Sequence, residues 1–299
     1  MLRASMSTLF SGDPNEVSLL GSLLLALGGG QDGFQYYINS SITEMYLVDG
    51  GAPEVTRRLG DDLGDALRLS SAVRRIARSD DGVTVFSDAV TVRAKYAIVT
   101  APPIVASQIE YVPPLPAAHS QLMRKMPPGA IWKFVTVYDK PFWRDMGLSG
   151  QTTAPQSPVP VSIEASPQSP DDGSSPRGEL ASFAVGRHAI ELERMGCEKR
   201  KETCLHELAL RLGEPAAHPI GYSETNWATE QWSLGGMMGH FPPGVLTAYG
   251  SALHEPAGRI YWAGGERATL MHGLMEGAVR SGEQAAQDVT EELRRLAPS

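Results

Sequence analysis

Two neighbouring stretches near the C-terminal end are the most informative part of the sequence, YWAGGE at residues 261–266 and MHGLMEGAV at residues 271–279. The first stretch has the pattern of a short strand that runs into the turn Gly264-Gly265. The second stretch predicts the start of a long helix over residues 273–293. A strand, a glycine turn and a helix in this order are typical of an α/β fold.

The first turn of this predicted helix has little side-chain bulk, because residues 273, 277 and 278 are Gly, Gly and Ala. A helix N-terminus carries exposed N–H groups and a partial positive charge, so it can bind an electron-rich or anionic group. Small residues would also let a flat ring system or a pyrophosphate approach the backbone. Tight packing of a helix on a sheet explains the same glycines, so spacing alone leaves both interpretations open.

The rest of the chain also mixes helical and β patterns. Helices are predicted over residues 15–27, 54–63 and 198–212. Strands are predicted at 68–76, 83–86, 96–100, 131–138, 159–163 and 180–185, the first three forming a small meander. The apolar segment from Leu19 to Leu27 is too short to span a bilayer and follows acidic residues, so we expect a buried helix.

Composition excludes several classes of function. The 299 residues suit one large or two ordinary domains, and the net charge of -8 argues against a general nucleic-acid or anionic-membrane surface. Cys197 and Cys204 fall about two helical turns apart, beyond the reach of a disulfide, which predicts reduced thiols and a cytoplasmic location. No cysteine and histidine spacing predicts a metal site.

Lys133 stands out within the predicted strand at 131–138. Strand alternation puts its side chain on the same face as Ile131, Val135 and Val137, where a charged amine is costly unless it has a partner. The alternative is a lysine on an edge strand, whose stem packs while its ammonium group reaches water.

The motifs above resemble the C-terminal FAD-binding signature of the flavin monoamine oxidase family. In that family an A-G-x-E turn precedes G-x-M-E-G-A-V and S-G-x-x-A-A. Other pieces agree with the family in order and spacing: Gly50-Gly51, Ser71-Ala72-Val73, Pro102-Pro103, Pro113-Pro114-Leu115-Pro116, Lys133 ahead of Pro141-Phe142-Trp143, Asn226-Trp227 and Phe241-Pro242-Pro243-Gly244. The resemblance covers nearly the whole chain.

This resemblance implies a FAD/NAD(P)-binding-type amine oxidase fold of the α/β class, incomplete, with an interleaved substrate domain of mixed sheet plus helices. The remaining parts of the FAD-binding domain would be residues 49–122 and 230–299. The substrate-binding domain would be residues 1–48 and 123–229.

The resemblance also implies roles for individual residues. Lys133 matches the catalytic lysine that is linked through a water to flavin N5, and Trp227 matches the tryptophan beside the flavin ring. The backbone of Val73 would contact adenine, while Glu266 and Met275 would lie along the ribityl and pyrophosphate or against the ring. The implied FAD contacts are Val73, Trp227, Gly264, Gly265, Glu266, Gly273, Leu274, Met275 and Ala278. Among the histidines, His272 is the one to test, because it lies beside the predicted flavin helix.

Three departures from the family pattern change what is implied. Gly236 stands where members with covalent flavin have a cysteine, so the FAD would be non-covalent. Met237 and Leu274 stand where monoamine oxidases have two aromatic residues around the substrate amine, which puts simple monoamines in doubt.

The third departure is the missing N-terminal βαβ unit with its GxGxxG motif. Gly28, Gly30 and Gly33 satisfy the spacing, but they follow a predicted helix instead of a strand, so we interpret them as a chance match. The chain would then begin inside the substrate domain. A surface left uncovered by that unit would make the chain oligomeric or dependent on a separate N-terminal chain.

The implied function is the oxidation of a small amine to an imine, with oxygen reoxidising the flavin. Two alternatives remain open. One is a non-enzymatic truncated or split subunit, and the other is an oxidase of amino acids or polyamines. No partner such as nucleic acid or membrane is implied.

Overall fold

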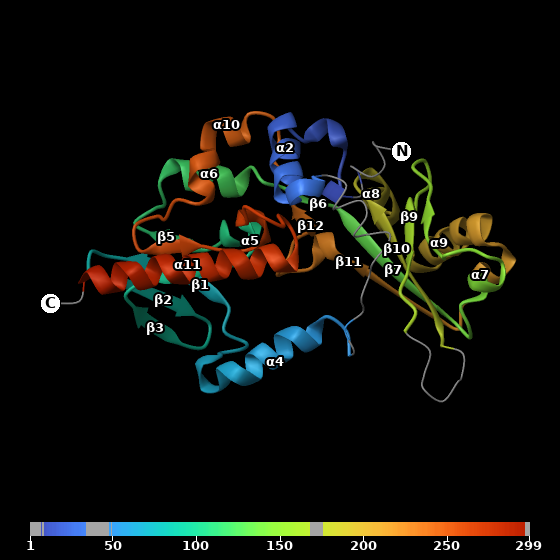
Figure 1. The fold of residues 1–299 in the computed structure, drawn as a ribbon, viewed down its shortest axis with the longest axis horizontal. Helices are drawn as coiled ribbons and strands as arrows, with labels where there is room; N and C mark the ends of the chain where they lie inside the picture. Colours follow the sequence, from blue (N-terminus) through green and yellow to red (C-terminus); the bar gives the residue numbers. More distant parts are fainter. Residues whose placement is uncertain (1–6, 8, 34–47, 49, 168–175, 297–299) are drawn as a thin grey trace. The chain divides into compact units, whose positions relative to one another are not determined.

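The structure is a computed structural model that describes residues 7, 9–33, 48, 50–167 and 176–296 (Figure 1). These residues cluster into two units. The first unit comprises residues 7, 9–16, 128–167 and 176–237, and the second unit comprises residues 17–33, 48, 50–127 and 238–296. Each unit is therefore assembled from segments that lie far apart in the sequence.

The first unit is built on a five-stranded sheet in the order β11-β7-β10-β9-β8, with every pairing antiparallel. The strands are β7 (Ile131–Tyr138), β8 (Thr152–Thr153), β9 (Val161–Glu164), β10 (Gly178–Val185) and β11 (Gly221–Asn226). The predicted strands at 131–138, 159–163 and 180–185 are confirmed as β7, β9 and β10. The polar sequence of β11, GYSETN, hides its strand character, which is evident only from its pairing with β7.

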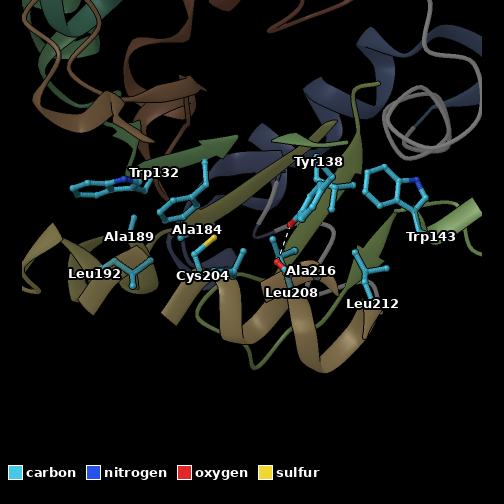
Figure 2. Close-up of a cluster of buried hydrophobic side chains, with 13 residues drawn as sticks. Trp132, Tyr138, Trp143, Ala184, Ala189, Leu192, Cys204, Leu208, Leu212 and Ala216 are labelled. Carbon is cyan, nitrogen blue, oxygen red and sulfur yellow. Dashed lines mark hydrogen bonds between the residues drawn. The ribbon is translucent and has the colours of Figure 1, made fainter. Parts of the chain in front are cut away.

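Helix α9 (Cys197–Leu212) covers one face of this sheet, as Figure 2 shows. Strand β7 alternates in burial, and its Trp132, Phe134 and Tyr138 point into a cluster that also contains Cys204, Leu208 and Leu212 of α9. The last three are spaced by four residues and so share one face of the helix. This cluster is the core of the first unit.

Shorter elements complete the first unit. They are η1 (Pro14–Glu16), β6 (Pro128–Gly129), α7 (Phe142–Asp145), α8 (Arg187–Glu193), η4 (Glu214–Ala217) and η5 (Trp227–Thr229). The hydroxyl of Tyr138 donates a hydrogen bond of 2.9 Å to the carbonyl of Ala216 in η4, drawn as a dashed line in Figure 2. Cys197 and Cys204 are both free thiols on α9, as their spacing predicts.

The second unit contains two small sheets. A four-stranded sheet has the order β3-β2-β1-β5, and β4 pairs with β13 in parallel. Their bounds are β1 (Val73–Arg78), β2 (Val83–Ser87), β3 (Thr91–Ala94), β4 (Ala97–Val99), β5 (Glu110–Val112) and β13 (Ile260–Trp262). The predicted meander is therefore correct for residues 73–87, but wrong for residues 96–100, which leave it to pair with a strand far along the chain.

The helices of the second unit are α2 (Leu19–Gly28), η2 (Gly30–Asp32), α4 (Pro53–Leu63), η3 (Gly64–Ala66), α5 (Pro103–Ala106), α6 (Ala117–Arg124), α10 (Val245–Tyr249), η6 (Gly250–Leu253), η7 (Gly265–Arg267) and α11 (Met275–Leu296). Strand β12 (Gly236–Gly239) begins within the first unit, where Gly236 and Met237 lie, and ends in the second. The predicted helices at 54–63 and 273–293 are confirmed as α4 and α11. None of the described helices is long and apolar enough to cross a membrane.

The apolar helix α2 differs from expectation in two ways. It begins at Leu19 instead of Asn15, because the hydroxyl of Ser18 accepts a hydrogen bond of 2.9 Å from the N–H of Gly21 and caps the helix. It is also buried on one side only, since Leu25 is 1% exposed whereas Leu19 and Leu27 are 76% and 72% exposed. A helix that is apolar on nearly every side carries no periodicity that could identify its inward face.

Replacing Leu208 by Ala should lower the free energy of unfolding by about 2–5 kcal/mol, because the side chain is fully buried against β7 and its removal leaves a cavity. Urea unfolding followed by circular dichroism measures the change. Leu210→Ala is the matched control, since Leu210 lies on the same helix but is 68% exposed. Equal losses in the two variants would contradict this packing.

Candidate functional site

The turn between β13 and α11 is held by a backbone contact between two glycines. The N–H of Gly273 donates a hydrogen bond of 2.9 Å to the carbonyl of Gly265. A Cβ atom on Gly265 would lie 3.3 Å from the Cα of Gly273, so there is almost no room for a side chain on Gly265. The chain therefore doubles back between β13 and α11 at the place where the sequence predicts the cofactor turn.

Two further observations explain why glycine is needed in this turn. Gly273 has a φ of +76°, and a Cβ there would collide with the sulfur of Met238. Gly264 has a φ of +131°. Both values lie in the region that residues with side chains rarely adopt. Because of this geometry α11 begins at Met275, two residues later than predicted.

Ser281 ties the turn to the helix. Its hydroxyl accepts a hydrogen bond of 2.8 Å from the N–H of Gly264 and lies 3.0 Å from the carbonyl oxygens of Gly264 and Ala278. The sequence shows Ser281 only as part of a family motif, without a role. Its function as a clamp on the glycine turn is apparent only from the coordinates.

Glu266 forms a hydrogen bond to the end of strand β12. Its carboxylate accepts a hydrogen bond of 3.3 Å from the N–H of Gly239 at the end of β12. This contact fixes the carboxylate within the second unit. Its implied role toward a ribityl or pyrophosphate group stays a prediction.

The other implied FAD contacts of the second unit lie on the same elements or on the sheet below them. Met275 and Ala278 belong to the first turn of α11, and Leu274 directly precedes it. Met275 is 58% exposed, and the N–H of Ala278 donates to the carbonyl of Leu274. Val73 begins β1 and packs on a core cluster that includes Trp262, the last residue of β13. The second unit thus holds eight of the predicted residues: Val73, Gly264, Gly265, Glu266, Gly273, Leu274, Met275 and Ala278.

His272 is buried within this loop, with 3% of its surface exposed. Its Nδ1 lies 3.2 Å from the carbonyl oxygen of Ala268, and its ring centroid is 5.9 Å from that of Phe241. Burial lowers the pKa of His272, although the carbonyl of Ala268 acts in the opposite direction. The neutral imidazole is therefore favoured in the folded chain.

Lys133 lies in the middle of the first unit's sheet. Strand β7 is flanked by β10 and β11, so the edge-strand alternative is wrong. Phe183 and Thr225 are its register partners on these strands, and its ammonium group lies 5.9 Å from the centre of the Phe183 ring. At this distance the ring is close enough for a cation–π contact.

Lys133 belongs to the less buried face of the sheet. Val135 and Val137 on that face are only partly buried, whereas Trp132 and Phe134 on the opposite face lie in the core under α9. The alternation predicted from the sequence is therefore present, and it explains how a charged amine is accommodated in an interior strand.

Trp227 follows β11 directly and is 39% exposed. The side-chain oxygen of Asn226 accepts a hydrogen bond of 3.0 Å from the N–H of Ala228, which fixes the start of η5 and the backbone of Trp227. Strand β11 itself is tied to α9 by Arg200, whose Nε lies 2.9 Å from a carboxylate oxygen of Glu224. The tryptophan is thus exposed on a well-anchored backbone.

Met237, in β12, is 53% exposed, and it precedes the part of that strand that belongs to the second unit. The first unit therefore holds Lys133, Trp227 and Met237. The predicted site residues form two groups, one in each unit, and each group is described within its own unit. Phe183 and Thr225 are additions to the first group that only the strand register reveals.

Comparison with known proteins gives a consistent result. The sequence model of a family described as flavin containing amine oxidoreductase matches residues 5–290. An L-amino acid dehydrogenase of Synechocystis sp. is 36% identical over 277 residues, which are 93% of this chain and 56% of that protein. The flavin-containing amine oxidase B of Bos taurus is 36% identical over 249 residues, which are 83% of this chain and 47% of that protein.

A solved structure of a putrescine oxidase triple mutant also superimposes on the chain. Its TM-score is 0.90 at 30% identity, and the superposition covers 97% of this chain and 63% of that one. The chain spans about half the length of the curated relatives it matches.

Replacing Gly273 by Ala should destabilise the second unit by more than about 1 kcal/mol, because the new side chain meets Met238 and the residue has a positive φ. Gly282→Ala is the matched control, since Gly282 lies within α11 with open space around it. That change should stabilise by roughly 0.5–1 kcal/mol. Thermal unfolding of both variants measures the two changes in stability. A change of the same sign in both variants would contradict the turn geometry.

The free energy of unfolding should decrease as the pH falls below the ordinary histidine value of 6.5, because His272 takes up a proton more readily when unfolded than when buried. His272→Gln should make this decrease smaller. Urea unfolding at several pH values between neutral and mildly acidic tests it. His206→Gln is the control, because His206 is exposed. If the dependence of the free energy of unfolding on pH were unchanged in His272→Gln, this role of His272 would be refuted.

Proposed function

Because the chain belongs to the flavin-containing amine oxidoreductase family, we propose that it takes part in the FAD-dependent oxidation of an amine to an imine, with oxygen as electron acceptor. The observation that carries the proposal is the contact between Gly265 and Gly273, two residues without side chains in the turn that leads into α11. This turn lies within the residues that match the family.

The residues of the turn fit a flavin dinucleotide. Gly264 has no side chain, the first-turn N–H groups of α11 have no partner within the helix, and Met275 presents an apolar side chain at 58% exposure. These features suit a flat ring and an anionic group. When bound, FAD supplies the hydride acceptor and the centre that reacts with oxygen, which no side chain can supply.

We propose that FAD is bound non-covalently. Gly236 occupies the position where covalent members of the family have a cysteine. A Cβ atom on Gly236 would lie 2.9 Å from Cγ2 of Ile131, so even a small side chain there would force a shift. The packing around this position thus supports a non-covalent cofactor.

Lys133 is assigned as the catalytic residue of the oxygen half-reaction. Its ammonium group carries protons on an interior strand, and the Phe183 ring limits where that group can move. We assign it to hold a water molecule and supply a proton as oxygen is reduced. Trp227 would pack beside the flavin ring.

The substrate is proposed to be a small amine other than a simple monoamine. Met237 and Leu274 are both apolar and neither is aromatic, so they would contact the substrate through flexible side chains. Amino acids and polyamines remain within this class, and similarity to an L-amino acid dehydrogenase and a putrescine oxidase supports keeping them.

We assign residues 49–122 and 230–299 to the FAD-binding domain, and residues 1–48 and 123–229 to the substrate-binding domain. The compact units differ from these bounds, since residues 17–33 belong to the second unit and residues 230–237 to the first. A cytoplasmic location remains a prediction from the two free cysteines.

A second candidate is a subunit that becomes active only with a separate N-terminal chain or in a homo-oligomer. Two apolar surfaces of the second unit favour it. One is formed by α2, where Leu19 and Leu27 are exposed. The other follows α11, at four exposed positions: Met275, Val279, Leu293 and Leu296. Apolar surfaces of this kind are typical of contacts with another chain.

The chain purified with FAD should be yellow, and denaturation should release the flavin into solution because it is not covalently bound. Lys133→Met should leave the FAD affinity unchanged but slow reoxidation by oxygen by about a hundredfold or more, through loss of the proton donor. Stopped-flow absorbance of the reduced flavin measures the rate.

Lys199→Met is the control for Lys133→Met, since Lys199 is a 70% exposed lysine on α9. Reoxidation at the wild-type rate in Lys133→Met would refute the role of that residue. A chain that stays colourless until a separate N-terminal chain is added would favour the second candidate over the first.

A further inference from the structure

The first unit contains a cavity of about 660 Å³ that lies outside the predicted site residues. Three segments line it. They are the N-terminal segment around Asp13, the connection between β8 and β9 around Gln156, and the end of β10 at Val185 together with Arg187 and His188 at the start of α8.

One lining residue of this cavity, Val185, belongs to the face of the sheet on which Lys133 lies. Val185 pairs with Ile131, and Phe183 pairs with Lys133, so the cavity wall is two residues along β10 from the partner of Lys133. Leu180 and Ala184 belong to the core on the opposite face, which puts Val185 on the Lys133 face. Two residues of a strand span about 7 Å.

Arg187 is the arginine of the cavity wall, and it is exposed. Among the residues that the structure describes, none forms an ion pair with its guanidinium. Asp13, the acidic residue of the wall, accepts a hydrogen bond of 2.9 Å from the N–H of Asn15. Nδ1 of His188 lies 3.4 Å from a carboxylate oxygen of Glu191, outside the wall.

The backbone before Arg187 is held in place. The N–H of Gly186 donates a hydrogen bond of 2.8 Å to the carbonyl of Ala130, and a Cβ on Gly186 would lie 3.3 Å from the Cα of Gly12. Gly186 also has a φ of +57°. This constraint fixes the backbone from which Arg187, the first residue of α8, extends.

We propose that the cavity receives the far end of the amine substrate, and that Arg187 binds a carboxylate there. The inference rests on the proposed function, because it takes Lys133 to mark the reacting end. A guanidinium binds a carboxylate through two parallel hydrogen bonds and repels a second ammonium group. The substrate class is therefore an amine with a carboxylate several carbon atoms away from the nitrogen.

The spacing separates this class from α-amino acids. In an α-amino acid the carboxylate is attached to the reacting carbon, so both would have to lie beside Lys133. The cavity instead begins about two strand residues away from that position. A flexible chain of several methylene groups bridges such a distance.

The test compares three amines with the same number of carbon atoms, which are ε-aminocaproate, hexylamine and norleucine. The FAD-loaded protein should oxidise ε-aminocaproate with the highest kcat/KM. Arg187→Gln should lower that value about tenfold or more, as expected for the loss of hydrogen bonds to a charged group, and leave hexylamine unchanged. Hexanoate, which has no amine, should bind the flavin-free chain in calorimetry and lose affinity in Arg187→Gln.

Arg194→Gln is the matched control, because Arg194 ends the same helix but is not in the cavity wall. Oxidation of hexylamine together with hexanoate binding that does not depend on Arg187 would overturn this inference and leave the proposed function intact. A preference for norleucine that disappears in Arg187→Gln would also overturn it. Hexanoate binding that depends on Arg187, without oxidation of any of the three amines, would support the carboxylate site and overturn the proposed function.

Discussion

The second unit depends on one close approach between backbones, that of Gly265 and Gly273. It joins the two ends of the twelve-residue connection, residues 263–274, through which the chain leaves β13 and enters α11. Ser281 then joins the helix back to Gly264, and Glu266 joins the turn to β12. A side chain at Gly273 would collide with Met238, and one at Gly265 would crowd the backbone of Gly273, so this recognisable part of the sequence also has a strict steric requirement.

Local sequence patterns predict most of the helices and strands, but they predict less well which of these elements pack or pair with one another. The helix predicted over residues 198–212 and the alternation predicted in residues 131–138 depend on patterns within one segment, and both are present as α9 and β7. The pairing of β4 with β13 joins segments far apart along the chain, and nothing in either segment specifies it. The exposure of α2 is equally hidden, because a nearly uniform apolar helix does not indicate which side faces inward.

The same distinction applies to the candidate site. The glycines of the turn could be predicted because their chemistry is local, and their resemblance to a flavin-binding signature adds a role. Phe183 could not be predicted, because its place opposite Lys133 is set by strand register. The obstruction by Ile131 at Gly236 likewise requires coordinates. Sequence identifies residues with unusual chemistry, whereas structure identifies the ordinary residues that surround them.

The interleaving of the two units has a consequence for synthesis on the ribosome. The first unit needs residues up to 237, and the second unit is completed only by β13 and α11, after the first has been made. Strand β4 therefore leaves the ribosome long before its partner exists. Neither unit can fold as soon as its first segment emerges, so nascent chains of this protein should depend on chaperones that protect apolar segments during translation.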